Sequence, residues 1–213
     1  MLAIDHIIIT AKDPEKAAKD FSEKNDVPIV QGGRHENWGT YNYLAYFSSE
    51  SYIEWIGIFD DTIANTSDNP LIKQVVNALT NGKEEVIQFA FRTDRMDKYI
   101  AYFAKENIPC TGPFSGSRKK PDGSMLKWRM LFPDTERMLP FLVEWGEVKN
   151  VPEEGKLISD QHIDQINFGT EDVNSFKRIF QGEFHDGMIQ LENGKIKLID
   201  SGKPSFIIGS NTI

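Results

Sequence analysis

Three segments of the chain share one pattern of apolar and polar positions. Each begins with a run of β-branched and aromatic residues typical of a strand, at residues 3–9, 85–91 and 162–168. Each run leads into a polar turn whose acidic residues suit the start of a helix, and then into apolar residues at helical spacing. The pattern predicts a strand followed by a helix three times.

The spacing within this pattern is constant, which indicates an internal repeat. A phenylalanine of each predicted helix follows a polar residue of the preceding strand by fifteen positions, in the pairs His6 and Phe21, Gln88 and Phe103, and Gln165 and Phe180. After the helix the chain returns to strand-like runs, for example at 41–47, 51–59, 125–132 and 138–145. The sequence therefore predicts an α+β fold made of repeated βαβββ modules.

The repeat sets the expected domain organisation. The first module takes residues 1–60 and the second takes 85–149, with a connecting helix in 61–84. An exposed linker at 150–156 leads to a third, shorter module at 158–213. We expect two paired modules and one shorter module beside them.

Composition narrows the class of protein. A hydrophobic content of 39% and the lack of an apolar run long enough for a membrane helix predict a globular chain without a membrane partner. The single cysteine, Cys110, excludes an intramolecular disulfide and, with an N-terminus that runs directly into a strand pattern, favours a cytoplasmic location. The net charge of -8 argues against nucleic acid as a partner.

Polar residues at matched places in the predicted strands are the candidate site. His6 and Gln88 share a place in the first strands of the two modules, and Glu54 and Glu144 share one in the last strands. A carboxylate between large apolar residues is costly to bury unless it is paired, protonated, hydrogen-bonded or bound to a cation. If the two modules enclose one cleft, these four residues form a nitrogen and oxygen set suited to zinc, nickel, cobalt or manganese.

Simpler interpretations of the same residues stay open. In these interpretations the two glutamates point into solvent from strands that have one solvent-exposed face. His6 is a core histidine that is hydrogen-bonded to Asp5 or to the backbone. Gln88 is the weakest ligand and serves equally well as a hydrogen-bonding group in a pocket without metal. Trp55 and Trp145 directly follow the glutamates, so strand alternation predicts that they point to the opposite face and pack in the core.

The sequence resembles the vicinal oxygen chelate superfamily, whose members pair βαβββ modules of the glyoxalase, bleomycin resistance and dioxygenase type around a metal cleft. In its glyoxalase I branch the ligands are a His or Gln on the first strand and a Glu on the last strand of each module. The resemblance implies the ligand set His6, Glu54, Gln88 and Glu144 in this chain. A glutamine in place of a second histidine argues against the iron chemistry of the ring-cleaving dioxygenases.

A narrower resemblance, to the bacterial glyoxalase-like domain proteins, rests on residues 32–35, 39–42 and 52–56. The substrate-binding candidates are His35 in a loop, the amide Asn42 and the aromatic Trp128. Arg118 and Arg129 are the candidates for pairing with an anionic group of the substrate. Loop charges are more often simply solvated, which remains the alternative for these cations.

The third module departs from the glyoxalase I pattern. It has Gln165 at the ligand position but no carboxylate in its closing strand, so it cannot build a second site of this kind alone. We expect a structural role for it. An odd module has no partner within the chain, so pairing with the same module of a second chain predicts a homodimer.

Two classes of function follow. The first is a metal-dependent enzyme of lyase or isomerase type that acts on a small oxygen-rich molecule, with Glu54 or Glu144 moving a proton and a divalent ion stabilising an oxyanion. The second is a metal-free protein that binds or sequesters a small molecule on aromatic residues such as Trp38, Tyr41 and Trp128. Metal content distinguishes the two, and the enzyme is the preferred hypothesis. A purely structural module is a weaker third possibility.

Overall fold

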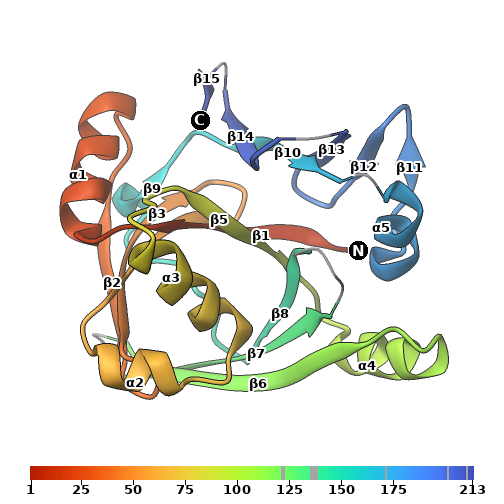
Figure 1. Cartoon of the computed structure of the whole chain (residues 1–213). Coiled ribbons are helices and arrows are strands. Elements are labelled where there is room, and N and C mark those ends of the chain that lie inside the picture. The colour runs from red at the N-terminus through yellow and green to blue at the C-terminus, as the bar shows by residue number, and fades with distance from the viewer. Residues whose placement is uncertain (121–122, 135–138, 171, 201, 210) are drawn as a thin grey trace.

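The computed structural model describes residues 1–120, 123–134, 139–170, 172–200, 202–209 and 211–213. Within this part of the chain a larger and a smaller β-sheet pack together, with helices around them (Figure 1). The fold class is α+β with repeated βαβββ units, as the sequence predicts.

The first unit consists of β1 (Ala3–Thr10), α1 (Pro14–Asn25), β2 (Val30–His35), β3 (Thr40–Phe47) and β4 (Ser51–Ile58). Helix α1 begins at the predicted acidic turn, where the carboxylate of Asp13 accepts the backbone N–H of Lys16 at 3.0 Å. The helix packs against β3 and β4 and leaves its charged residues in solvent.

Two helices connect the first two units. They are α2 (Asp61–Thr66) and α3 (Pro70–Thr80), and Ser67 between them is extended. Pro70 has no N–H to donate to a preceding helical turn, so it begins a new helix, which Asn69 caps by accepting the N–H of Leu71 at 3.0 Å. The connecting helix expected within 61–84 corresponds to α3, and α2 is an additional short helix before it.

The second unit consists of β5 (Val86–Arg92), α4 (Met96–Lys105), β6 (Cys110–Lys119), β7 (Met125–Pro133) and β8 (Phe141–Trp145). The last strand was expected from Met138, which lies outside the described residues, and β8 begins at Phe141.

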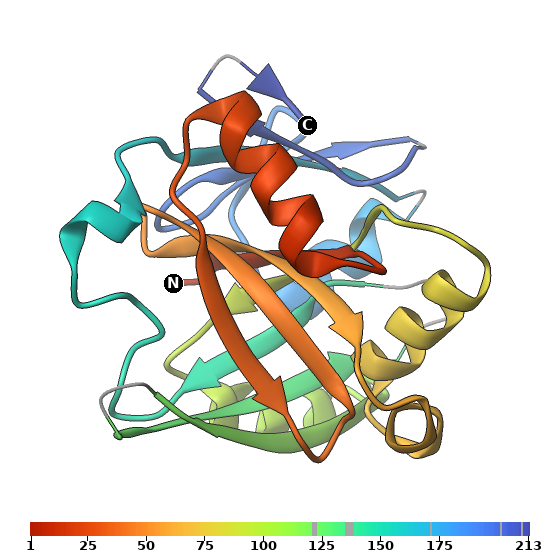
Figure 2. The same ribbon diagram turned by 90° about the vertical axis from the view of Figure 1, so that its left-hand side faces the viewer.

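The first two units share one sheet with the strand order β2-β3-β4-β1-β5-β8-β7-β6. β1 and β5 run antiparallel at its centre, and each pairs in parallel with the last strand of its own unit, β4 or β8. The two ends of this order, β2 and β6, lie against each other, so the sheet curls into a cup (Figure 2). The two units are thus related as halves of one cup.

Helix α3 fills part of the inside of this cup. Its apolar residues Leu71, Val75 and Ala78 pack with Ile8 and Ile56, which project inward from β1 and β4. Figure 1 shows the helix crossing the strands of the curled sheet. The space left for a ligand is consequently smaller than the curl of the backbone alone suggests.

The third unit forms the smaller sheet. After a short 3-10 turn at Gly155–Leu157 and β9 (Ile158–Ser159), which pairs with β3, come β10 (Ile163–Gly169), α5 (Val173–Phe180), β11 (Phe184–His185), β12 (Met188–Gln190), β13 (Lys195–Ile199), β14 (Ser205–Ile208) and β15 (Asn211–Thr212). β10 is parallel to β13 and antiparallel to β14, which repeats the pairing of β1 with β4 and β5. The strand order is β11-β12-β13-β10-β14-β15.

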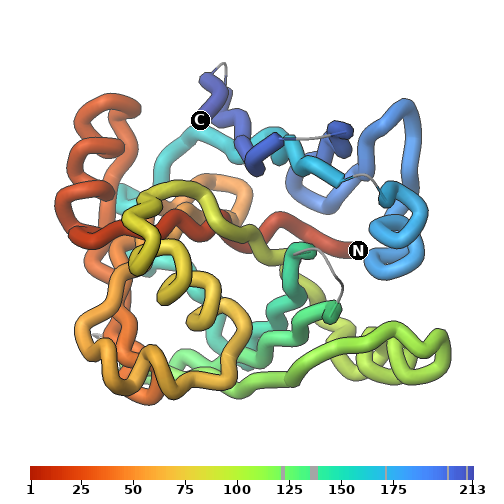
Figure 3. The backbone as a smooth tube through the Cα atoms, in the orientation of Figure 1, coloured from red at the N-terminus to blue at the C-terminus, as the bar shows by residue number. Residues whose placement is uncertain are grey.

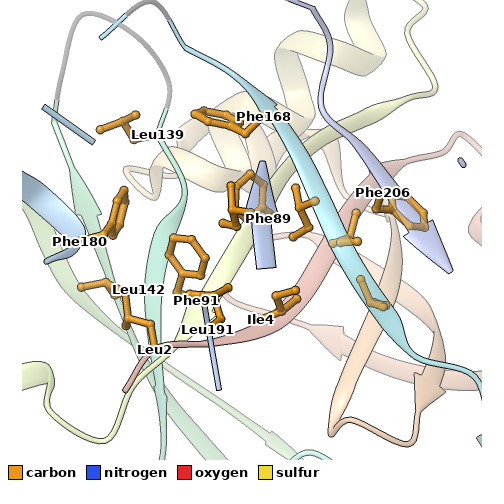
Figure 4. Close-up of a cluster of buried hydrophobic side chains, with 14 of the residues drawn as sticks. Leu2, Ile4, Phe89, Phe91, Leu139, Leu142, Phe168, Phe180, Leu191 and Phe206 are labelled. Carbon is orange, nitrogen blue, oxygen red and sulfur yellow. The ribbon is translucent and has the colours of Figure 1, made fainter. Parts of the chain in front are cut away.

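The main core lies between the two sheets. Phe89 and Phe91 project from the convex face of the larger sheet, and their rings contact those of Phe168 and Phe180 at centroid distances of 5.4 and 5.0 Å (Figure 4). Edge-to-face contacts of this kind add stability beyond the burial of apolar area. The third unit is therefore fixed to the cup by a continuous aromatic core.

This packing bears on the expected homodimer. The apolar face of the smaller sheet, which includes Ile166 and Phe206, is covered by the chain's own larger sheet. The opposite face carries Gln165, Asn167 and Lys197, none of which is buried. Partly exposed apolar residues, Ile207 and Ile199, lie on the same face, so this face is mixed and the homodimer stays a prediction.

The N-terminal strand also joins the two sheets. Figure 3 shows the first residues beside the third unit, where the N–H of Glu192 donates to the carbonyl of Leu2 at 2.9 Å.

In the described part of the chain, no helix has both the length and the apolar composition needed to cross a membrane.

Candidate functional site

A cavity of about 50 Å³ lies inside the cup. Strands of both units and the start of α3 line it, and its wall is mainly apolar and aromatic. The polar groups that reach it are His6, His35, Asn42, Glu54, Arg118 and Asn150. This lining, apolar and aromatic with a few convergent polar groups, is typical of small-molecule sites, although such sites usually enclose about 300 to 1,000 Å³.

Glu54 is the central polar group of this cavity. It projects from β4 and is only 6% exposed. Its Oε1 accepts a hydrogen bond of 2.5 Å from the side-chain amide of Asn42, and its Oε2 lies 3.5 Å from Nε2 of His6. A carboxylate in such a place is stable only when neighbours satisfy it, and here the amide of Asn42 donates to one oxygen while the other oxygen faces His6.

Asn42 is held in place by the strand beside it. Its Oδ1 accepts the backbone N–H of Gly33 at 2.8 Å while its Nδ2 donates to Glu54. A side chain at Gly32 would bring its Cβ to 1.9 Å from the same Oδ1. The two adjacent glycines on β2 therefore leave the space that Asn42 needs to orient Glu54.

His6 is held on both sides. Its Nδ1–H donates to Oδ1 of Asp5 at 2.6 Å, because an ionised carboxylate can only accept. The ring stacks on Tyr52 with a centroid distance of 4.6 Å. Nε2 consequently points toward Glu54, and a proton can lie on either of these two groups.

Asp5 reaches His6 through an irregularity in β1. The pairing with β5 shifts between Ile4 and His6, so Asp5 is the extra residue of a β-bulge. Ile4 lies in the core between the sheets whereas His6 lines the cavity, which regular alternation would not allow. The second oxygen of Asp5 accepts the indole N–H of Trp145 at 2.8 Å.

Three tryptophans form much of the cavity wall. Trp38, Trp128 and Trp145 lie edge to face or tilted against one another, with centroid distances of 6.1 Å for the first pair and 5.5 Å for the second. Gly116 on β6 makes room for Trp128, since a Cβ there would lie 2.2 Å from the indole. Trp145 points to the face opposite Glu144, as strand alternation predicts, but because Glu144 faces outward Trp145 lies in the cavity wall, whereas Trp55 is in the core between the sheets.

His35 and Arg118 complete the polar lining. Burial lowers the pKa of His35, the nearby carboxylate of Glu54 opposes this shift, and Arg118 adds to it. The guanidinium of Arg118 donates to Asn150 at 3.0 Å, and its side chain passes close to Gly33, where a Cβ would lie 2.5 Å from Cδ of Arg118. The substrate-binding candidates His35, Asn42, Arg118 and Trp128 thus share one cavity.

The other three candidates lie elsewhere. Gln88 is buried, but its amide donates to the carbonyl of Leu139 at 2.9 Å and its Oε1 accepts the N–H of Phe89. Glu144 points to the outside of the sheet, where it accepts the N–H of Met96 at 3.0 Å and pairs with Arg129. None of Gln88, Glu144 and Arg129 lines the cavity.

Strand register explains why Glu144 is displaced. Glu54 of β4 pairs with Ile8 of β1. The residue of β5 that corresponds to Ile8 in the repeat is Ala90, and it pairs with Phe141 of β8. Phe141 therefore occupies the place that Glu54 has in the first unit. The similarity of Glu54-Trp55 to Glu144-Trp145 suggests a different alignment, which the sheet does not follow.

These positions also decide how well the residues fit a divalent metal. Of the four expected ligands only His6 and Glu54 face each other, and Nδ1 of His6 and Oε1 of Glu54 already have partners. The described residues contain no cluster of three or more His, Cys, Asp or Glu side chains arranged to hold an ion. The donors present do not fit the expected four-ligand centre.

The sequence did not identify Asp5, Tyr52, Trp145 or Asn150 as site residues. For Asp5 the isoleucines at positions 4 and 7–9 mark no single face of the strand, so the bulge leaves no local signal. For Asn150, in an irregular segment after β8, we find no local signal.

Comparison with known proteins shows which proteins are similar to this chain in sequence and in structure. The sequence matches the family described as Glyoxalase-like domain over residues 4–184. The comparison with curated proteins found no match. A hypothetical protein from Staphylococcus aureus has a similar structure, with a TM-score of 0.80 and 18% identity over 98% of this chain and 91% of that one.

Structures of methylmalonyl-CoA epimerase resemble part of this chain. A variant from Streptomyces coelicolor, in complex with 2-nitronate-propionyl-CoA, has a TM-score of 0.51 and 18% identity over 70% of this chain and 98% of that one. A methylmalonyl-CoA epimerase in complex with methylmalonyl-CoA and NH4+ has a TM-score of 0.51 and 20% identity over 68% and 96%. At this identity the likeness concerns the fold alone. The family match over most of the sequence, together with this fold, shows that the chain belongs to the Glyoxalase-like domain family of the vicinal oxygen chelate superfamily.

Proposed function

We propose that the protein is an enzyme of isomerase or lyase type that binds a small oxygen-rich molecule in the cup and moves a proton with Glu54 and His6. The observation that carries the proposal is the buried Glu54 carboxylate, 3.5 Å from the imidazole of His6 and open to a cavity lined by tryptophans. Burial of an acid beside a base in a cleft is typical of sites of proton transfer.

The proposed roles follow from the contacts. Asn42 holds one oxygen of Glu54, so the other oxygen is directed at His6 and at the cavity. A proton taken from a bound carbon acid by Glu54 passes to His6 Nε2, or returns to the substrate at a neighbouring atom. Arg118, which also lines the cavity, is the cation that pairs with an anionic or enolate-like oxygen of the substrate.

The expected divalent metal is not part of this proposal. Gln88 and Glu144 already bind other groups of the chain, and Phe141 stands where a second carboxylate would be needed. The steps above therefore use only side chains that reach the cavity.

The proposal is tested by hydrogen exchange at carbon. Small hydroxy acids, keto acids and diketones are screened for binding through tryptophan fluorescence, and compounds that bind are incubated with the protein in deuterium oxide. The wild type should catalyse the incorporation of deuterium, detected by NMR, because Glu54 removes a carbon-bound proton. Glu54→Gln should still bind the compound but lose about 10²-fold to 10⁴-fold in exchange rate.

The matched control is Glu15→Gln, which removes an exposed carboxylate of α1 that does not line the cavity. It should leave both binding and exchange unchanged. Exchange at the wild-type rate in Glu54→Gln would contradict the proposal.

A binding protein of the same fold is the second candidate. The observation that favours it is the wall of three tryptophans around a cavity with only one acidic side chain. If this function is the correct one, compounds bind tightly to the wild type without any exchange of deuterium, and substitution of Trp128 weakens binding more than substitution of Glu54.

A further inference from the structure

The third unit contacts the strand that carries the site, at the point where β1 extends beyond the end of β4. Pairing between β1 and β4 begins at His6 and Tyr52, so Ile4 has no strand partner on that side. The side chain of Asn193, from the turn between β12 and β13, takes this place. Its Oδ1 accepts the N–H of Ile4 at 2.7 Å, and its Nδ2 donates to the carbonyl of Ile4 at 2.9 Å.

The turn that carries Asn193 is shaped for this contact. Its Nδ2 also donates to the carbonyl of Ser49 at 2.9 Å, between β3 and β4. Gly194 allows the close approach, because a Cβ there would lie 2.8 Å from the side chain of Ile4. One amide of the third unit thus ties together two segments of the first unit.

The residue next to this contact is Asp5, the extra residue of the bulge. It is 1% exposed, and both of its oxygens are used, one by His6 at 2.6 Å and the other by the indole of Trp145 at 2.8 Å. The guanidinium of Arg92 lies 3.8 Å from the second oxygen. A buried carboxylate with two directed bonds fixes the orientation of both partners.

We infer that Asp5 is the positioning residue of this pocket, which holds His6 with its proton on Nδ1 and Trp145 against the cavity, and that Asn193 of the third unit holds the bulged strand from which Asp5 projects. The inference deepens the proposed function and rests on it for its catalytic meaning. The geometry it describes belongs to the protein without ligand. The third unit, which lacks a site of its own, then contributes to the site of the other two.

The wild-type protein provides the first test. An imidazole ¹⁵N NMR spectrum at neutral pH should show Nδ1 of His6 protonated, and the indole N–H of Trp145 should be protected from solvent exchange. An unprotonated Nδ1 would overturn the inference without any variant.

Asp5→Asn is the second test, since it keeps the size of the side chain and removes only the ability to accept two hydrogen bonds at once. The amide can accept from one partner and must present its N–H₂ to the other. We expect either the proton of His6 to move to Nε2 or the indole of Trp145 to lose its protection. Unchanged signals for both residues would overturn the role of Asp5.

Asn193→Ala tests the contribution of the third unit, with Asn167→Ala as its matched control. Asn167 is also an asparagine of the smaller sheet, but it bonds to Ser205 on the face away from the cup. We expect Asn193→Ala to change the His6 and Trp145 signals in the direction seen for Asp5→Asn, and Asn167→Ala to leave them unchanged. Identical spectra for the two variants would overturn the role of Asn193.

These spectra are recorded without substrate, so they stand apart from the deuterium experiment. If Glu54→Gln retains full exchange while the spectra behave as expected, the proposed function fails and the positioning of His6 and Trp145 by Asp5 is retained. If the spectra do not change as expected while exchange depends on Glu54, the positioning role of Asp5 is rejected and the proposed function is retained.

Discussion

Glu54 and Phe141 occupy equivalent positions in the two halves of the larger sheet. Glu54 pairs with Ile8, and Phe141 pairs with Ala90, the repeat equivalent of Ile8. Both side chains are buried inside the cup, and the ring of Phe141 lies edge-on to His6 at 5.7 Å. One half of the cup thus provides a carboxylate and the other provides an aromatic ring.

Phe141→Glu should create affinity for a divalent ion. The new carboxylate would lie beside His6 and Glu54 and supply a third donor, which is the minimum that protein sites for zinc use. Zinc binding is measured by calorimetry on protein stripped with a chelator, with Phe141→Gln as the control of similar size and weaker donor strength. No gain of zinc affinity over the wild type would show that the halves are not equivalent at this position.

Chelation should leave the wild-type activity unchanged. In the proposed mechanism Glu54 and His6 act without an ion, so deuterium exchange should proceed at the same rate before and after treatment with a chelator. Metal content by mass spectrometry is measured on the same samples. A loss of exchange that zinc, nickel, cobalt or manganese restores would contradict the mechanism and return attention to a metal centre at His6 and Glu54.

Gly32→Ala should damage the site more than the fold. The added Cβ would overlap Oδ1 of Asn42, which must move and release Glu54. Overpacking of this kind costs about 1 to 3 kcal/mol of stability. Ligand binding should weaken while the protein stays folded, as judged by urea denaturation and tryptophan fluorescence. Gly155→Ala, where a Cβ meets nothing within 4 Å, is the control.

Phe89→Ala should loosen the contact between the two sheets. The side chain is 1% exposed and its ring contacts Phe91 and Phe168, so its removal leaves a cavity in the main core. We expect a loss of about 3 to 5 kcal/mol in the free energy of unfolding. Denaturation in urea measures it. A loss well under 1 kcal/mol would indicate that the smaller sheet does not depend on this core.

The stability of the protein should fall as the pH drops below the ordinary pKa of histidine. Burial lowers the pKa of His35 in the folded state, so between its unfolded and folded pKa values only the unfolded chain binds the proton. The free energy of unfolding should therefore decrease as pH falls through about 6.5. His35→Gln should reduce this decrease, whereas substitution of the exposed His185 should not. Equal pH slopes in the wild type and His35→Gln would contradict the assignment.

The repeat, the fold class and the polar pair of the first unit could be predicted from the sequence, because they depend on local periodicity. The strand of Glu54 pairs with both neighbours without a register shift, so the side chains that share its face follow from simple alternation. The rest depended on register. A bulge at Asp5 and a displaced alignment at Glu144 each move side chains to the other face of the sheet, and neither can be read from local spacing.

The asymmetry of the cup has a stereochemical consequence. Glu54 and His6 approach the cavity from the first unit, while the described residues of the second unit present apolar side chains, Val143 and Met130, and the cation Arg118 but no acid or base. A planar enolate held between them would meet the acid and base from one side alone. Protonation would then generate a single enantiomer, and only one enantiomer of a racemic starting material would react.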